Sequence, residues 1–522
     1  MLNIKPLVFL PPFILCVTVV VLSFANEQLF STVVADADRW VSSTFGWLVL
    51  LLAFGMLVLC GVIYASSFGR VVIGGPDAKR LLTKWQMFAV VLTTNLGTGV
   101  LFWGMFEPLS YLSKPPLIAH ADPFSPEAAK FAISTVFLHW TSTPYAIATI
   151  VGLMFAFAYY NMKKPFSLGA PLSPLLGSYS EGRLAQIIDA ICLYTLVAAM
   201  AAALGGSSLL LGGGVNHLLG IDEAPSRLLL AVIVAAIVIV AVVDSITGLT
   251  KGIRIVAGIN TSFLIIFLAM LFVLGPTLYI LNFSTEGFGY FLNHYFEKVL
   301  GTGAADQDDW PRNWTQMHFA AWFAWAPIMG VFLGRISRGY TVREFIVFNA
   351  LLPAVFTGIW MAIFCSTAVH MQLYEGIDLA AQLDPSDPLR VLYVVLDRLP
   401  FTGILVPILL VTSFLSMVTT VDSNTDAMSN ISSTGISPEN PEASVFVKIL
   451  WGLVMGMIAW IMVTFAGLDG IRMLSRLGGL PVLFLCVAIA GSAILVMMNP
   501  SRFNRFPAER STTPEKPNKD LR

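Results

Sequence analysis

The sequence predicts an all-α integral membrane protein with about twelve transmembrane helices. Of its 522 residues, 57% are hydrophobic and only 12% are charged, and the mean hydropathy is +0.79. A soluble domain of ordinary composition carries about 25% charged residues, so the class of soluble multidomain proteins is excluded. Apolar runs of about 20 residues, the length that a helix needs to cross a bilayer, recur along the chain.

Hydropathy and loop charge together give the predicted topology. The predicted spans are 7–25, 44–67, 85–113, 127–159, 185–214, 228–249, 253–281, 315–335, 342–368, 398–430, 445–467 and 477–498. Several are longer than a bilayer requires, which indicates tilt or a break. Lysine and arginine concentrate in the loops after the second, fourth, sixth and eighth spans. The positive-inside rule assigns these loops to the cytoplasm, and an even number of spans then places both termini there.

The segments outside the spans and the cysteines exclude several other classes. The net charge of −1 provides no basic excess for nucleic acid, and the five cysteines lie scattered without a CxxC pair. The acidic stretch 282–313 is expected to be an external loop or amphipathic segment. The polar, proline-containing residues 500–522 are expected to form a disordered cytoplasmic tail. Its basic residues could contact anionic membrane lipid, although a solvated flank is the simpler interpretation.

The third span contains residues that a simple membrane anchor would avoid. Its stretch TTNLGTGVLFWGMFEPLSYL, residues 93–112, includes Gly97 and Gly99. Glycines two positions apart lie on different faces of a helix, so they form a poor packing seam, which prefers a separation of four. Glycine also permits unwinding, and unwound backbone at membrane depth can coordinate a cation through its free carbonyls. Ordinary close helix packing remains the alternative.

Two later spans also contain residues that are unusual in a membrane helix. Pro327 and Gly330 are expected to break the eighth span, and Thr419, Thr420 and Asp422 lie in the tenth. An acidic residue within a span is costly and is usually functional or paired. Adjacent threonines supply the hard oxygen ligands that sodium prefers. Each hydroxyl taken alone is explained equally well by bonding back to the preceding helical turn.

Aromatic residues cluster in the fourth and eighth spans. Trp140 and Tyr145 belong to the stretch HWTSTPYAIA, and Trp322 and Trp325 lie three apart on the eighth span, hence on one helix face. A lone tryptophan in a span usually marks the membrane interface. These clusters lie beside prolines and well inside their spans, which favours the wall of a binding pocket. Aromatic faces typically bind quaternary ammonium or sulfonium cations.

These motifs together resemble the betaine/carnitine/choline transporter family. The resemblance is carried by GTGVLFWGMFEP, FAWAPIMGVFLGRISRGYTVREF, TTVDSNT and GLTKGIRIVAGIN, and it covers about residues 5–500. It implies two leading helices (1–84), a first five-helix repeat (85–281), the external segment, an inverted second repeat (314–499) and the tail. It also implies alternating access, a plasma-membrane location (the bacterial inner membrane) and a homotrimer.

The resemblance also assigns roles to residues. Substrate would lie between the glycine-rich stretch of the third span and an aromatic box from the fourth and eighth spans. The only further ligand implied is sodium as coupling ion, and no other cofactor is expected. The implied substrate residues are Asn95, Gly97, Gly99, Trp103, Trp140, Tyr145, Trp322 and Trp325. The implied sodium ligands are Thr93, Leu96, Thr419 and Thr420.

The sequence departs from the family pattern at three places. The family's Gly-x-Gly-x-Gly becomes Asn95 to Gly99, a Trp-Trp pair becomes Ala321-Trp322, and an aromatic residue becomes Ala148. The box therefore loses two rings, and an amide enters the break. This favours a larger or more polar solute than a plain trimethylammonium compound, with Asn95 donating to its anionic end. Some choline carriers that resemble this family have an aspartate in the glycine-rich stretch. Gly99 is uncharged, which favours a zwitterion over a bare cation.

Four functional hypotheses follow. The first is a sodium-coupled symporter of a betaine-like zwitterion, and the second is a sodium-independent exchanger or proton-coupled carrier of choline- or carnitine-like compounds. A transport-dead sensor would share every motif, whereas an integral-membrane enzyme would need convergent acids or histidines that the sequence does not indicate. Arg338 and Arg343 are expected at an inner gate, paired with acids such as Asp422 or Glu344. Positive-inside topology alone is the alternative explanation for these arginines.

Overall fold

The computed structural model describes residues 4–96, 99–221, 223–246, 252–383, 390–436 and 442–506. Helices account for nearly all of these residues, and none of them belongs to a β-strand. The helices of the amino-terminal half are α1 (Pro6–Ala25), α2 (Glu27–Ala65), α3 (Lys84–Leu96), α4 (Gly99–Ser113), α5 (Pro126–Trp140), α6 (Ser142–Ala156), α7 (Ser173–Leu176), α8 (Arg183–Leu218), α9 (Arg227–Ile246) and α10 (Gly252–Leu274). Those that follow are α11 (Thr277–Leu300), α12 (Met317–Ile336), α13 (Val342–Ile346), α14 (Leu352–Tyr374), α15 (Arg390–Asp397), α16 (Thr402–Ser432), α17 (Val445–Met498) and α18 (Pro500–Phe503).

The apolar helices confirm a multi-pass membrane protein. In the described part of the chain, nine helical stretches are long and apolar enough to cross a membrane, and the number is 11 when each of two bent helix pairs counts as one span. Helix α1 contributes an apolar stretch, Pro6–Thr18, that is shorter than these spanning helices. Adding α1 to the other spans accounts for the twelve segments that the sequence predicts.

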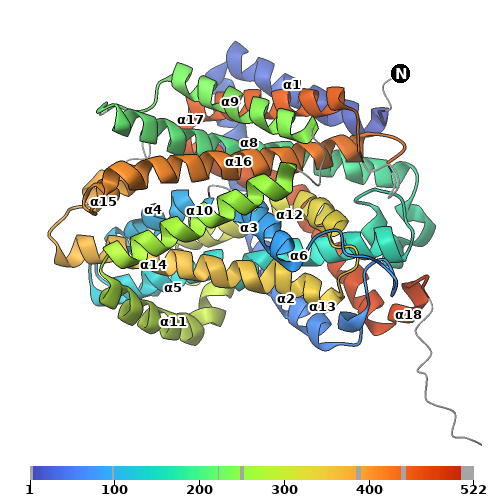
Figure 1. The fold of residues 1–522 in the computed structure, drawn as a ribbon, viewed down its shortest axis with the longest axis horizontal. Helices are drawn as coiled ribbons and strands as arrows, with labels where there is room; N and C mark the ends of the chain where they lie inside the picture. Colours follow the sequence, from blue (N-terminus) through green and yellow to red (C-terminus); the bar gives the residue numbers. More distant parts are fainter. Residues whose placement is uncertain are drawn as a thin grey trace, which may run out of the picture.

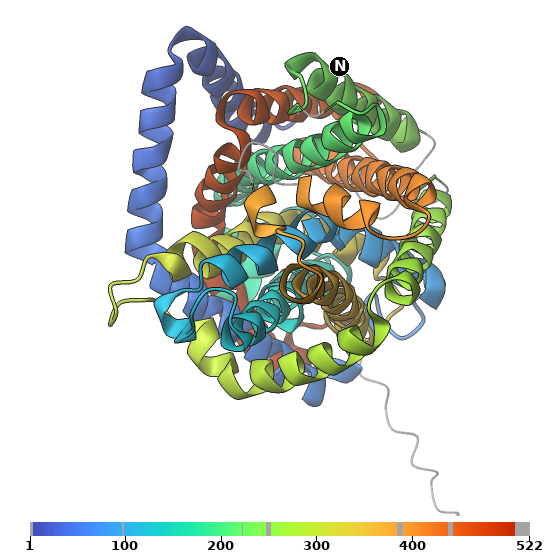
Figure 2. The same cartoon turned by 90° about the vertical axis from the view of Figure 1, so that its left-hand side faces the viewer.

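The centre of the molecule is built around α6 and α12. Every residue of α6 from Thr143 to Ala156 is buried, as expected for a helix that is apolar on all sides. Figure 1 shows α6 and α12 inside the bundle, with α1, α8, α9 and α17 on one side and α4, α5, α11 and α14 on the other. In Figure 2 the blue helix α2 stands at the edge of the molecule. The contact between α6 and α12 therefore lies within the buried core of the fold.

Small residues allow α6 and α12 to approach closely. A Cβ atom added at Gly330 would lie 2.8 Å from Val151 Cγ1, and one added at Gly334 would lie 2.7 Å from Phe155 Cδ1. The two glycines are four residues apart, so they share one helix face. The sequence predicts Gly330 as a helix breaker. In the structure it lies within α12 and packs against α6.

The third and eighth predicted spans are bent. The axes of the stretches Lys84–Thr94 and Gly99–Ser113 differ by 59°, and those of Arg312–Pro327 and Met329–Ile336 differ by 49°. Pro327 explains the second bend, because a proline inside a helix removes one backbone hydrogen bond and its ring clashes with the preceding turn. Both predicted breaks therefore coincide with bends in the structure. The first lies between α3 and α4 in the third span, and the second lies within α12 in the eighth span.

The fourth span is also interrupted, at a place that the sequence does not flag. Helix α5 ends at Trp140, and α6 begins at Ser142, with Thr141 in a non-helical conformation at φ −113° and ψ −130°. Pro144 lacks the N–H group that would bond to the carbonyl of residue 140. The break therefore lies directly beside the predicted pocket residue Trp140.

Three other segments differ from the simplest expectation. Helix α17 continues through both predicted spans 445–467 and 477–498 as one helix of 54 residues. The intervening stretch has glycines, which weaken a helix, but no proline to interrupt it. The predicted external segment begins with most of α11. The predicted tail begins with α18, and Arg505 then donates its backbone N–H to the Asn161 carbonyl at 3.1 Å. Residues 507–522 lie outside the described part.

Candidate functional site

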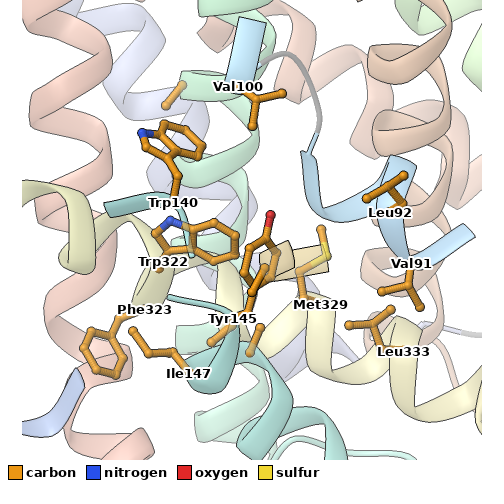
Figure 3. Packing of buried hydrophobic residues seen from close by; sticks show 14 of the residues in the cluster. Val91, Leu92, Val100, Trp140, Tyr145, Ile147, Trp322, Phe323, Met329 and Leu333 are labelled. Carbon is orange, nitrogen blue, oxygen red and sulfur yellow. The ribbon is translucent and has the colours of Figure 1, made fainter. Parts of the chain in front are cut away.

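The structure brings three of the predicted box residues together at the α6–α12 contact. The rings of Tyr145 and Trp322 meet edge to face with their centroids 5.0 Å apart. Figure 3 shows Trp140 on the other side of Trp322, with its ring in the same cluster. All three side chains are buried, with 6%, 0% and 9% of Trp140, Tyr145 and Trp322 exposed. The aromatic box is defined here as Trp140, Tyr145 and Trp322.

Gly99 lies directly against the aromatic box. A Cβ atom added at Gly99 would lie 3.1 Å from Trp140 Cη2 and 3.4 Å from Cζ3. The first residue of α4, just after the bend in the third span, therefore faces the far edge of an indole ring. This contact places Gly99 beside the aromatic box.

Tyr145 is held at its other end by α14. The hydroxyl of Thr357 lies 3.3 Å from that of Tyr145 and also donates to the Pro353 carbonyl at 2.6 Å. The Tyr145 hydroxyl is thus close to a polar partner, although its ring is fully buried. A buried tyrosine needs such a partner because an unsatisfied hydroxyl is costly in the protein interior.

A buried carboxylate joins α4 to α5 behind the box. Glu107 is 1% exposed, and its Oε2 accepts the indole N–H of Trp140 at 2.8 Å. Its Oε1 accepts the hydroxyl of Tyr111 at 2.7 Å and lies against Nδ1 of His139. Buried charges persist where several hydrogen bonds or an opposite charge satisfy them, and Glu107 meets this requirement.

Two other predicted substrate residues are only partly buried, in contrast to the aromatic box. Trp325 is partly exposed and packs at the border of the core. Trp103 makes ring contacts with Phe106 at 5.9 Å and with Trp314 at 6.3 Å. Gly97 lies outside the described residues, and so do the side chains of Asn95 and Leu96. Their roles therefore stay predictions.

Three of the four predicted sodium ligands are buried and lie on neighbouring helices. Thr93, Thr419 and Thr420 are each 0% exposed, and α3, which carries Thr93, contacts α16, which carries the other two. Each hydroxyl donates to a carbonyl of its own helix, at 2.9, 2.9 and 2.8 Å, respectively. Such a bond uses the hydroxyl proton and leaves lone pairs on the oxygen for a cation.

Additional buried oxygen atoms occur on α3 and on α10, which contacts both α3 and α16. Thr94 Oγ1 on α3 and Asn260 Oδ1 on α10 have no hydrogen-bond partner among the described residues. The amide nitrogen of Asn260 donates to Ser416 Oγ on α16 at 2.7 Å. A hard cation would satisfy buried oxygen atoms of this kind. Sequence reasoning missed Asn260, which could have been noticed as an amide in an apolar span.

The predicted gating arginines contact groups other than the expected acids. Arg343 donates to the Tyr64 carbonyl at 2.8 Å, and the side chain of Arg338 is exposed. Glu344 pairs with Arg80 at 2.7 Å, and Asp422 is buried in α16. None of these contacts joins Arg338 or Arg343 to Asp422 or Glu344.

A different arginine forms a buried ion cluster at this end of α12. Arg335 pairs with Asp426 of α16, and Lys448 of α17 lies 3.0 Å from the other carboxylate oxygen of Asp426. The side chains of Arg335, Asp426 and Lys448 are 6%, 1% and 3% exposed. The cluster therefore links three helices whose sequence positions are far apart. Asp426 lies one turn after Asp422, and only packing distinguishes the two acids.

Comparison with known proteins places this arrangement in context. The family model described as the betaine/carnitine/choline family transporter matches residues 7–502. The chain is 27% identical to a glycine betaine transporter of Acinetobacter baylyi, over 98% of this chain and 76% of that protein. It is 27% identical to an ectoine/hydroxyectoine transporter of Virgibacillus pantothenticus, over 91% of this chain and 93% of that protein.

Two further similarities complete the comparison. An osmo-independent choline transporter of Acinetobacter baylyi is 27% identical over 81% of this chain and 80% of that protein. The solved structure of a Na+-coupled sialic acid symporter has a TM-score of 0.44 and 14% identity, over 86% of this chain and 85% of that chain.

Proposed function

Because this chain belongs to the betaine/carnitine/choline transporter family, whose members are transporters and not enzymes, we propose that it is a sodium-coupled symporter of a betaine-like zwitterion. The substrate class is a quaternary ammonium or sulfonium compound with an anionic group, including non-standard members of that class. The curated relatives transport glycine betaine, ectoine and choline according to their names.

The meeting of Trp140, Tyr145 and Trp322 beside Gly99 is the observation that carries this proposal. Three aromatic rings from two spans converge at a helix break, where backbone can approach a ligand. Aromatic faces attract a desolvated organic cation, and the cluster lies deep in the protein. Tyr145 and Trp322 contact one another directly, so their faces must separate for a ligand to lie between them. Such a movement suits an alternating-access cycle.

The uncharged bend of the third span favours a zwitterion over a bare cation. The bend in the third span is flanked by Asn95 and Gly99, where an acidic residue would pair with a cation. We propose that Asn95 donates its amide to the anionic end of the substrate. Gly97 and Gly99 would let the backbone approach the solute, while Trp103 and Trp325 would line its route to the box.

Sodium coupling is supported by the oxygen atoms on α3 and α16. The carbonyls of Thr93 and Leu96 would be freed where α3 ends, and the hydroxyls of Thr419 and Thr420 come from the neighbouring helix. An ion shared between these helices would tie the two proposed inverted repeats, 85–281 and 314–499, together. Sodium and substrate would then raise each other's affinity by the same factor.

A sodium-independent exchanger or proton-coupled carrier of choline- or carnitine-like compounds is the second candidate. The Glu107–His139 pair next to the box favours it, because these groups could exchange a proton near the substrate. Against an exchanger, no lysine or arginine that could replace sodium occurs in 93–112, 255–281 or 413–430.

Uptake into proteoliposomes tests these alternatives. Labelled glycine betaine, ectoine, choline, carnitine and a sulfonium compound are offered with a sodium gradient, with a proton gradient and with neither. We expect sodium-stimulated uptake of a zwitterion and loss of sodium dependence when Thr419 and Thr420 are both replaced by alanine. Uptake that ignores sodium in the wild type would support the second candidate. Binding without uptake under every gradient would indicate a sensor.

The cellular setting is part of the same proposal. We propose a homotrimer in the bacterial inner membrane, with both termini and the basic loops on the cytoplasmic side. Basic residues of the carboxy-terminal segment, such as Arg502 and Arg505, would contact anionic lipid there. Cysteine accessibility labelling in intact cells tests the sidedness, and native mass spectrometry tests the oligomeric state.

A further inference from the structure

We propose that Glu107 and His318 are positioning residues that set the orientation of the Trp140 and Trp322 indoles in the aromatic box. The inference rests on the proposed function, because it concerns how the box is arranged to bind an organic cation. Neither residue is placed in contact with the substrate. Each would act through the N–H group of one tryptophan.

Glu107 and Gly99 hold Trp140 at opposite ends of its ring. The indole N–H donates to Glu107 Oε2 at 2.8 Å, while Gly99 faces the distant Cη2 and Cζ3 edge. An indole has one donor, so a bond to a fixed acceptor removes most of its freedom to rotate about the side-chain bonds. Glu107 is itself fixed by Tyr111 and His139.

His318 links the same network to Trp322. It lies one helical turn before Trp322 on α12, and the Trp322 indole N–H donates to His318 Nε2 at 3.2 Å. The ring of His318 stacks on His139 with a centroid distance of 4.8 Å and an interplanar angle of 19°. It also meets the ring of Trp140 edge to face at 4.8 Å. One imidazole thus contacts both tryptophans of the box.

The break between α5 and α6 supplies a competing partner for His318. His318 Nε2 also lies against the backbone carbonyl of His139. A ring nitrogen that carries a proton can donate to this carbonyl, and one that lacks the proton can accept from Trp322. Nε2 cannot do both at once, so the orientation of Trp322 is linked to the position of the proton on His318.

This arrangement explains why polar groups are buried behind an aromatic box. A cation–π contact needs the ring face, and not the edge, to point toward the cation. Bonding each indole through its N–H edge leaves the ring faces for the ligand. The network also joins α4, α5 and α12, so the two tryptophans from different spans are oriented together.

Two measurements test the inference, one without ligand and one with it. Protein labelled with ¹⁵N-tryptophan gives indole N–H resonances, which Trp140→Phe and Trp322→Phe assign. We expect Glu107→Gln to shift the Trp140 resonance and His318→Phe to shift that of Trp322. Glu375→Gln serves as the matched control, because Glu375 pairs with His370 at 2.8 Å at the partly exposed end of α14. It should shift neither resonance.

The second measurement is a double-mutant cycle on ligand affinity. Glycine betaine, ectoine and choline are the probes, measured by calorimetry in detergent. His318→Phe keeps an aromatic ring at the stacking position and should weaken binding about tenfold, the usual scale for one lost hydrogen bond. Trp322→Phe removes the indole N–H group. In that background, His318→Phe should weaken ligand binding by less than about twofold. A second cycle that combines Glu107→Gln with Trp140→Phe should show the same loss of effect. Glu107→Gln should weaken binding in the wild type and have little effect in Trp140→Phe.

The outcomes separate this inference from the proposed function. Unshifted indole resonances in Glu107→Gln and His318→Phe would overturn the positioning role, whatever the ligand data show. Additive losses in both cycles would also overturn it, because they would reveal a general structural effect. If the resonances shift but the wild type binds none of the three probes, the positioning role stands and the proposed substrate class fails.

Discussion

The ion cluster of Arg335, Asp426 and Lys448 provides the sharpest test of the packing at the end of α12. Two cations share one carboxylate, and all three side chains are almost completely buried. Glu442 lies 3.7 Å from Lys448, but its side chain is 40% exposed, so solvent screens much of its effect. The perturbation that we consider is Asp426→Asn, which removes the shared negative charge.

The expected cost follows from the charges that remain. At the 3.0 Å separation of Lys448 Nζ and Asp426 Oδ1, an effective dielectric constant of about 20 gives an attraction of about 5 kcal/mol. Desolvation offsets part of this attraction, but removing one partner leaves buried charge uncompensated. Such changes typically cost about 3–5 kcal/mol. We therefore expect Asp426→Asn to lower the free energy of unfolding by about 4 kcal/mol.

A second variant turns this value into a ranking. Lys448→Met removes one of the two cations that contact Asp426 and leaves the Arg335–Asp426 pair in place, so it should cost about 1 kcal/mol or less. The double variant of Asp426→Asn and Lys448→Met buries one cation fewer than Asp426→Asn alone and should be more stable than it. Glu442→Gln, a change at an exposed partner of Lys448, serves as the control and should have a cost within about 1 kcal/mol.

Unfolding of the purified protein in detergent, followed by fluorescence during heating and denaturant titration, measures this ranking. The reasoning is refuted if Asp426→Asn is as stable as the wild type within about 0.5 kcal/mol. It is equally refuted if Lys448→Met destabilises the protein as much as Asp426→Asn does. Either result would mean that the buried charges are not coupled as the structure shows.

Three further predictions concern the aromatic box and the buried Lys298 of α11. Trp322→Ala should weaken binding of the transported zwitterion about thirtyfold in calorimetry, because a desolvated cation–π contact is worth about 2 kcal/mol; Trp325→Ala should cost less, and the reverse order would contradict the box assignment. Gly99→Ala should reduce uptake several-fold, since its Cβ would crowd Trp140 at 3.1 Å, whereas Gly55→Ala has no atom within 4 Å and should transport normally; equal uptake by both variants would argue against this contact. Burial lowers the pKa of Lys298 in α11 well below its usual range, so the unfolded state binds more protons, and thermal stability should rise with pH between that lowered pKa and about 10.4. In Lys298→Met, the melting temperature should rise less with pH than it does in the wild type. An unchanged slope would mean that a group other than Lys298 causes the pH dependence.

Trp314 belongs to the network that surrounds the aromatic box. It lies at the amino-terminal end of the eighth predicted span. In the structure its ring meets Tyr111 at 4.8 Å, and Tyr111 donates to Glu107. Replacement of Trp314 should therefore disturb the box indirectly, which is why Trp325 is the better comparison for Trp322.

The sequence by itself determined the class of protein, its spans and the positions of two interruptions. Apolar run length depends only on neighbouring residues, because every backbone polar group in a bilayer must be satisfied within its own helix. Proline and glycine also act locally, so the bend at Pro327 and the bend between Thr94 and Gly99 could be anticipated. The motifs were sufficient to recognise the transporter family that the comparison confirms.

Only the tertiary structure decided which polar groups meet. The sequence shows Glu107, His139 and His318 as isolated polar residues 32 and 179 positions apart, and nothing in their spacing predicts that they surround two indoles. Likewise, the sequence assigns the gating role to Arg338 and Arg343, yet the structure exposes Arg338 and buries Arg335 against Asp426. The reason is geometric. Helix rotation and crossing are set by packing against other helices, and a rotation of one residue, about 100°, moves a side chain from lipid to the protein interior.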